Sequence, residues 1–289
     1  MALGRRFVWR VRNREIAVGT RTLVMGILNV TPDSFSDGGR FRDLEAAVAH
    51  GKRMIADGAD LIDVGGESSR PGSCPVPVEE ELSRVIPVVD RLVKEAGAVV
   101  SIDTTKARVA AEAVAAGAVV VNDISALRFD PRMADVVAHT KAGIVLMHMQ
   151  GDPKTMQADP RYGDVVGEIA AFLRDRGAAA MKAGVRAEGI VYDPGIGFGK
   201  TVDHNLEILR RLPEFASLDR PILVGPSRKA FIGKVLGDLP AADRLEGTAA
   251  AVALAVAGGA AIVRVHDVME MVRVARMAEA VARGPNAGG

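Results

Sequence analysis

The chain has 289 residues, of which 48% are hydrophobic and 25% are charged, and its formal net charge is +1. A chain of this length buries enough surface to fold without disulfides or a structural metal, and its balanced charge argues against nucleic-acid binding. Cys74 is the single cysteine, which excludes an intrachain disulfide and a cysteine-based metal site. The most apolar stretch, 249–263, is too short to cross a bilayer. We therefore expect no membrane contact, no signal peptide before the first motif and a cytoplasmic location.

The chain begins with arginines that alternate with apolar residues, between Arg5 and Arg14. This alternation predicts an edge strand or a hairpin with a solvated face rather than a targeting segment. Eight short apolar runs follow, each rich in β-branched or aliphatic residues, as is typical of strands buried on both faces of a parallel sheet. These runs are 23–30, 61–65, 98–103, 119–123, 143–149, 189–193, 221–225 and 261–266.

Longer segments with apolar residues at helical spacing separate the predicted strands. The predicted helices are 44–57, 78–95, 106–116, 133–141, 165–182, 204–211, 244–257 and 268–282. Several are followed by a glycine that suits the left-handed position after a helix. These glycines are Gly58, Gly97, Gly117 and Gly184.

Eight strand–helix units in a chain of this length predict an α/β fold of the (β/α)8, or TIM-barrel, type. A doubly wound open sheet is the alternative, but it would concentrate polar residues at one switch point. Here polar residues follow nearly every predicted strand, which favours the barrel. We expect a single domain over 1–289, made of an N-terminal extension (1–22), the barrel (23–284) and a disordered tail (285–289).

The polar side chains that follow the predicted strands mark the face where such barrels carry their active sites. They are Asn29, Asp63 with Glu67, Asp103, Asn122, His148, Asp193, Ser227, Arg228, Lys229, Arg264 and His266. Any one of the acids can be explained as a cap for the next helix. The convergence of acids, amides and basic groups on one face predicts chemistry instead.

Three basic residues, Lys229, Arg264 and His266, follow the last two strands, where barrels often bind phosphate. Arg264 and His266 are two residues apart in a strand, so both point to the same side. The three residues predict an anion site. Arg228 either belongs to this site or faces solvent.

Asp103, Asn122 and Asp193 form a second group of strand-end residues. Carboxylates bind the guanidine-like edge of a flat heterocycle through paired hydrogen bonds. A divalent-metal site is the alternative, but two acids with no nearby histidine favour the heterocycle. His148 is either catalytic or a packed, hydrogen-bonded barrel residue. The glycine-rich segment 195–201 is not a phosphate-binding P-loop, because Pro194 stands where that loop requires glycine.

Two loops, 29–40 and 65–77, are rich in Gly, Pro and Ser and are longer than usual for a strand-to-helix connection. Phe35 in the first and Arg70 in the second favour active-site lids over simple linkers.

Seven motifs, in order along the chain, resemble the signatures of the dihydropteroate synthases. They read MGILNVTPDSFSDGG at 25–39, GGESSRPG at 65–72, SIDT at 101–104, NDI at 122–124, DPGIGFGK at 193–200, SRK at 227–229 and RVHD at 264–267. The resemblance extends from about residue 23 to the last predicted helix.

This resemblance implies a transferase of folate biosynthesis that is a target of sulfonamides. Its substrates would be 6-hydroxymethyl-7,8-dihydropterin pyrophosphate and 4-aminobenzoate, and its products 7,8-dihydropteroate and pyrophosphate. The resemblance also implies Mg2+ as cofactor and a homodimer, for which the apolar stretches 249–257 and 269–282 would supply the contact.

The resemblance further assigns roles to individual residues. Asn29 would bind the Mg2+, and Arg70 would lie on the second lid. The phosphate oxygens would be held by Ser69, Lys229, Arg264 and His266. The pterin edge would be bound by Asp103, Asn122 and Asp193, with Lys229 also reaching the ring.

Apolar and lid residues complete the implied site. Met147 would line the pocket, and Phe198, in the motif at 193–200, would also contact substrate. The aminobenzoate would be framed by Phe35, Pro71 and Ser69. The residues expected to be catalytic are Lys229, Arg264, His266 and Asp103.

Two other functions are compatible with a pterin-binding barrel. A module that passes a methyl group from a pterin to a corrinoid partner would keep the acids but would not need the phosphate set or the two lids. A non-catalytic paralogue would show broken lid or anion motifs. Both sets are intact here, which favours the synthase.

Overall fold

The computed structural model describes residues 5–31, 39–68 and 75–283, with the backbone alone described at 39–42 and 283. Eight parallel strands form one sheet in the order β8-β7-β6-β5-β4-β3-β10-β9. A bridge between Tyr192 and Ile222 joins the two ends of this order and closes the sheet into a barrel. The predicted (β/α)8 barrel is therefore confirmed.

All eight predicted barrel strands are present, each within a few residues of its expected bounds. They are β3 (Leu23–Asn29), β4 (Leu61–Gly65), β5 (Val100–Asp103), β6 (Val120–Asp123), β7 (Gly143–Met147), β8 (Ile190–Asp193), β9 (Leu223–Val224) and β10 (Ile262–Val265). Every residue of β4 and of β7 is buried, as expected for strands covered on both faces.

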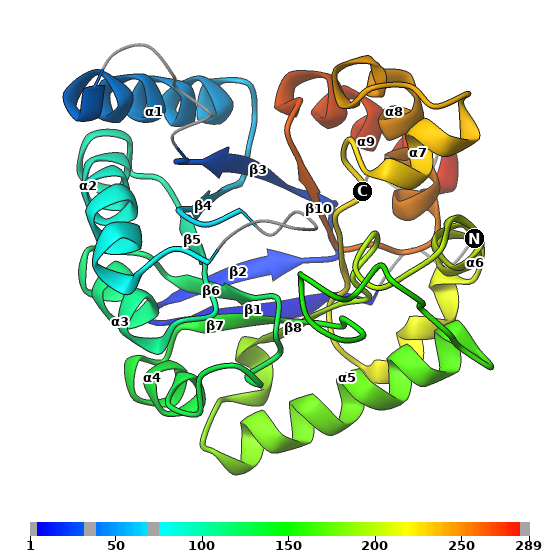
Figure 1. Ribbon diagram of the computed structural model, residues 1–289, viewed down its shortest axis with the longest axis horizontal. Coiled ribbons are helices and arrows are strands. Elements are labelled where there is room, and N and C mark those ends of the chain that lie inside the picture. Colours follow the sequence, from blue (N-terminus) through cyan, green and yellow to red (C-terminus); the bar gives the residue numbers. More distant parts are fainter. Residues whose placement is uncertain (1–4, 32–38, 69–74, 284–289) are drawn as a thin grey trace.

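The helices form a ring around the strands (Figure 1). They are α1 (Gly39–Ala56), α2 (Val78–Ala96), α3 (Ala107–Ala115), α4 (Met133–Thr140), α5 (Val165–Lys182), α6 (Val202–Arg210), α7 (Ala230–Val235), α8 (Leu245–Ala257) and α9 (Val268–Arg283). The short helix α7, which begins directly after Lys229, was missed by the sequence analysis. Its six residues are too few to display a helical period.

Helix α2 illustrates how the sequence specifies this ring. Leu82, Val85, Val89 and Leu92 recur at helical spacing and are buried. Gly97 ends the helix in the left-handed conformation, with φ of 61°, and its backbone N–H donates to the carbonyl oxygens of Leu92 and Val93. The chain can therefore turn directly back into β5.

An antiparallel hairpin, β1 (Phe7–Val11) and β2 (Arg14–Val18), precedes the barrel. Trp9 is fully buried, and its indole Nε1 donates a 2.9 Å hydrogen bond to the carbonyl oxygen of Gly189, where β8 begins. A Cβ on Gly143, the first residue of β7, would lie 2.5 Å from Val11 Cγ1. The hairpin thus closes the N-terminal end of the barrel and leaves the opposite, C-terminal face for ligands.

Among the described residues, no helix combines the length and the apolar character needed to span a bilayer.

Candidate active site

Arg264, near the end of β10, lies at the centre of the polar side chains on the C-terminal face. Its Nε donates to Asp63 Oδ2 at 2.6 Å, and its Nη2 donates to Asp103 Oδ2 at 2.7 Å. The Asp63 carboxylate also accepts from Asn122 Nδ2 at 2.8 Å. One guanidinium therefore connects the ends of β10, β4, β5 and β6.

This arrangement differs from the two separate groups that the sequence suggested. Arg264 was placed with the anion-binding residues, but its guanidinium is held by two carboxylates of the acidic group. Asp63 is fully buried and anchors both Arg264 and Asn122. The sequence analysis found Asp63 at a strand end but gave it no role, although an acid inside an otherwise apolar strand was the available signal.

The two carboxyl groups of the predicted heterocycle site have pKa values raised by burial. Burial raises the pKa of Asp103 to about 7, and the nearby Asp63 and Glu81 carboxylates add to the effect, against the pull of Arg264 and Lys229. Burial likewise raises the pKa of Asp193 to about 6, opposed by the Gly195 backbone N–H, which donates to Asp193 Oδ1 at 2.6 Å. Both groups therefore titrate close to neutral pH.

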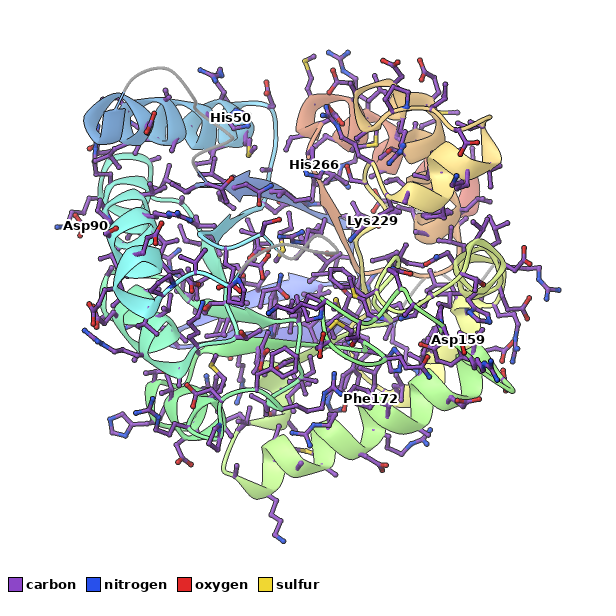
Figure 2. All side chains as sticks on the ribbon, in the orientation of Figure 1. His50, Asp90, Asp159, Phe172, Lys229 and His266 are labelled. Carbon is purple, nitrogen blue, oxygen red and sulfur yellow. The ribbon has the colours of Figure 1, made fainter. Side chains whose placement is uncertain are left out.

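Lys229 and His266 approach from the last two strands (Figure 2). Ser227 Oγ lies 3.0 Å from His266 Nδ1 and accepts from the His266 backbone N–H at 3.2 Å. Burial lowers the pKa of His266 to about 3, helped by the Arg264, Arg228 and Lys229 cations, so the ring is neutral at pH 7. With the Ser227 hydroxyl on Nδ1, this geometry favours a ring that presents its N–H at Nε2.

Arg228 faces away from this group. Its guanidinium pairs with Asp267, with Nε 3.0 Å from Oδ2, which resolves the alternative left open by the sequence. Its backbone has φ of 57°, and it is held there by Thr248 Oγ1 on its N–H and by Arg244 on its carbonyl oxygen. This local strain turns Lys229 toward the barrel mouth while Arg228 points to α9.

Apolar side chains border the acids and the lysine. Met147 is buried and packs with Phe198 and Ile124. The Lys229 ammonium lies 4.0 Å from the centroid of the Phe198 ring, at cation–π distance. Ile124, which the sequence analysis quoted in a motif without a role, thus belongs to the pocket wall.

A cleft of about 380 Å³ opens beside Asp103, over the ends of β4 to β7. Its lining includes Glu67, Lys106, Thr104, Ile124, Phe129 and Asp152. Lys106 bridges Glu67 and the fully buried Glu81. Glu67, named at a strand end by the sequence analysis, therefore braces the start of the second predicted lid.

His148 and Lys200 form a buried pair behind Asp193. Lys200 Nζ is 3.1 Å from His148 Nδ1 and donates to the carbonyl oxygen of Phe198 at 2.8 Å. Burial and the nearby Lys200 and Arg128 cations lower the pKa of His148 to about 2. His148 is therefore the packed, hydrogen-bonded residue of its two predicted alternatives. Lys200 was given no role, although it was compared with a P-loop and ends the motif at 193–200.

Some predicted site residues lie outside the described part of the chain. These are Phe35, Ser69, Arg70 and Pro71, along with Cys74. Asn29 is described and ends β3 half-buried. Within the described ranges there is no cluster of three or more His, Cys, Asp or Glu side chains suited to a metal.

Comparisons with known proteins place this geometry in context. Residues 25–266 match the family model described as pterin binding enzyme. The chain is 50% identical over 265 residues to a dihydropteroate synthase of Synechocystis sp., covering 92% of each protein.

Solved structures agree with the sequence match. A Xanthomonas albilineans dihydropteroate synthase with 4-aminobenzoic acid is 46% identical with a TM-score of 0.89, covering 96% of this chain and 100% of that one. A Yersinia pestis dihydropteroate synthase in a sulfonamide drug complex is 43% identical with a TM-score of 0.89, covering 95% and 98%.

The buried position of Asp63 generates a stability prediction. Asp63→Ala leaves the Arg264 guanidinium and the Asn122 amide without a shared partner, so we expect a loss of about 3–5 kcal/mol in the free energy of unfolding. Equilibrium urea unfolding measures it. The control is Asp90→Ala, which breaks a solvent-exposed pair with Lys94 on α2 (Figure 2) and should cost less than about 1 kcal/mol. Equal losses in the two variants would show that Asp63 is no anchor.

Proposed function

The chain belongs to the pterin-binding enzymes, as one of their dihydropteroate synthases, and on this premise we propose how its residues carry the reaction. The reaction joins 6-hydroxymethyl-7,8-dihydropterin pyrophosphate to 4-aminobenzoate and releases pyrophosphate. The observation that carries the assignment of roles is the position of Arg264, which pairs with Asp63 and Asp103 and acts electrostatically on His266. The family match supports the synthase over a methyl-transfer module or a non-catalytic paralogue.

The pterin ring binds at Asp103, Asn122 and Asp193. Asn122 donates its amide N–H to Asp63, which leaves the amide oxygen as an acceptor. Together with the two carboxyl groups, this gives three acceptors for the N–H donors along one edge of the pterin. Met147 and Phe198 supply apolar contact for the flat ring, and Lys229, against Phe198, reaches both the ring and its pyrophosphate.

The pyrophosphate binds at Lys229, Arg264 and His266, with Ser69 and Arg70 contributed by the second loop. His266 offers a neutral Nε2–H donor, and the two cations offer charge. Phe35, Pro71 and Ser69 frame the aminobenzoate. The donors toward the leaving group are positioned by the fold before the reaction, so they need little reorganisation as charge develops.

The reaction proceeds by departure of the pyrophosphate and capture of the pterin methylene. The C–O bond breaks with its electron pair going to the pyrophosphate oxygen, which Lys229, Arg264 and His266 stabilise. Asp103 stabilises positive charge on the pterin. The neutral amine of 4-aminobenzoate then forms the C–N bond with its lone pair and loses a proton to solvent, so no strong general base is needed.

Asn29 would hold the Mg2+ that binds together with the substrate. Gly65 lies between Asn29 and Asp103. A Cβ atom on this glycine would be 3.8 Å from Asn29 Oδ1 and 3.6 Å from Asp103 Oδ2, so the two oxygens face the same small space. A single amide oxygen beside a carboxylate fits Mg2+, which usually takes one or two protein oxygens and completes its shell with water and substrate phosphates. Bound in this way, Mg2+ offsets negative charge on the pyrophosphate oxygens.

Helices α8 and α9 present an apolar outer face that fits a second copy of this chain. Leu254, Met277 and Val281 are 60%, 66% and 61% exposed. Apolar surface of this kind marks interaction sites, so the proposed assembly is a homodimer through these helices.

Sedimentation equilibrium should give a mass twice that of one chain, and the double variant Met277→Lys, Leu254→Glu should reduce the measured mass to that of one chain. Val235→Lys, at a similarly exposed site on α7, is the control; a monomeric unmodified protein would refute the dimer.

The reaction is tested by mixing the protein with the pterin pyrophosphate, labelled 4-aminobenzoate and Mg2+. We expect dihydropteroate and pyrophosphate to form in equal amounts, to fall when EDTA removes the metal, and to recover with added Mg2+. A sulfonamide should compete with the aminobenzoate, since it mimics that substrate. Absence of both products with all three components present would contradict the proposed function.

Lys229→Ala should depress turnover and weaken binding of the pterin pyrophosphate. Loss of one preorganised donor costs about 10²–10³ in kcat. Steady-state kinetics with each substrate varied in turn measures the effect. Lys234→Ala, which changes an exposed lysine of α7 that pairs with Asp238, is the matched control. Unchanged kinetics in Lys229→Ala would overturn its assignment.

A further inference from the structure

Lys200 is buried beneath the candidate active site, yet the groups that its ammonium contacts directly carry no negative charge. The residue is 3% exposed, and its ammonium contacts the carbonyl oxygens of Phe198 and His148, at 2.8 and 3.4 Å, and His148 Nδ1 at 3.1 Å. Burying a cation in this way is costly, and a well-packed apolar side chain of similar volume is often at least as stabilising. The position of Lys200 therefore calls for a reason other than stability.

Lys200 connects mechanically to the proposed pyrophosphate site through the loop that it ends. Its ammonium holds the backbone of Phe198, and the Phe198 ring lies against the Lys229 ammonium at 4.0 Å. Gly197, in the same loop, also packs against the Lys229 side chain, since a Cβ atom on this glycine would lie only 2.9 Å from Lys229 Cδ. A shift of this loop would consequently move the surface on which Lys229 rests.

His148 ties the same lysine to the proposed pterin site. Its backbone N–H donates to the carbonyl oxygen of Asp193 at 2.9 Å, and its ring packs edge-on against Phe172 of α5, labelled in Figure 2. The ring is neutral, so Nδ1 accepts from the ammonium. Only glycine fits at position 195 beside His148, since a Cβ atom there would lie 1.9 Å from the His148 carbonyl oxygen.

Lys200 also acts on Asp193 through its charge. The groups that favour the Asp193 carboxylate are the Gly195 N–H and three cations, Lys229, Lys200 and Arg264. Lys229 and Arg264 are partly exposed toward the mouth, whereas Lys200 is enclosed behind it. Burial lowers the pKa of Lys200 itself to about 7, against the opposing effect of Asp193, so this lysine and Asp193 influence each other's charge near neutral pH.

We propose that Lys200, held by His148, is a positioning residue of the reaction, which fixes the Phe198 backbone and with it the surface against which Lys229 lies. The inference rests on the roles assigned above to Asp193 and Lys229. Lys200 itself touches no substrate, because the Phe198 backbone and His148 cover its ammonium.

The test compares Lys200→Met, which removes charge and donor, with Lys200→Gln, which keeps a donor for the Phe198 carbonyl but no charge. The kcat/KM for the pterin pyrophosphate is measured at pH 8, with the KM for 4-aminobenzoate measured alongside. Because Lys200 fixes the loop against which Lys229 lies, we expect the loss to fall on the pterin pyrophosphate and not on 4-aminobenzoate.

The two variants separate the hydrogen bond from the charge. Lys200→Met should lower kcat/KM for the pterin substrate at pH 8 by about tenfold, as for loss of one hydrogen bond. Lys200→Gln should lower it less, and the KM for 4-aminobenzoate should stay unchanged in both. Lys182→Met, at an exposed lysine that ends α5, should leave all these constants unchanged.

Two controls keep the inference distinguishable from the proposed function. Asp193→Asn tests the pterin-site assignment: if this variant behaves like the unmodified enzyme, the assignment itself fails. If Asp193→Asn is impaired while folded Lys200→Met keeps the original kcat/KM for the pterin pyrophosphate, the inference about Lys200 alone is overturned. Should Lys200→Met not fold, Lys200→Gln decides the question, since a KM for 4-aminobenzoate that changes as much as the kcat/KM for the pterin pyrophosphate in that variant refutes a positioning role at Lys229.

Discussion

The site depends on one buried cation, Arg264, shared by two carboxylates. Asp63 and Asp103 come from adjacent strands, β4 and β5, while Arg264 reaches them from β10 on the other side of β3. Within the described residues the second oxygen of Asp63 has no hydrogen-bond partner, so its one engaged oxygen holds both Arg264 and Asn122. A charge cluster of this kind is stable only because the barrel closes around it, with the Trp9 hairpin at one end and aliphatic strands on every side.

This cluster explains why the two halves of the reaction can share one barrel mouth. The pterin needs acceptors and the pyrophosphate needs cations, and inside a barrel groups of opposite charge attract one another strongly. Here Arg264 compensates the acids from within, while His266 stays neutral and Lys229 rests on an aromatic ring. Burial raises the pKa of Asp103 to about 7 and that of Asp193 to about 6, because few groups around these carboxylates replace the water that burial removes.

The barrel and the strand-end residues could be predicted from the sequence because each rests on a local pattern. Apolar runs, helical spacing and glycines such as Gly97 report on the backbone near them. The pairing of Arg264 with Asp63 could not be predicted in this way, because the two residues are 201 positions apart and meet only when the barrel closes. The opposite directions of Arg228 and Lys229 follow from one positive φ, which no residue type signals when the residue is not glycine. Lys200 was misjudged for a related reason: its importance lies in its burial, whereas a motif comparison considers only its neighbours in sequence.

A crystal structure of the enzyme with a non-reactive analogue of the pterin pyrophosphate and Mg2+ tests the central claim most directly. The account predicts that the N–H edge of the ring lies within about 3 Å of oxygens of Asp103, Asn122 and Asp193, and that the phosphate oxygens contact Lys229, Arg264 and His266. It also predicts that Arg264 keeps its contact with Asp63 when the ligand binds. A pterin seated instead in the cleft between Lys106 and Phe129, with no contact to Asp193, would contradict the account.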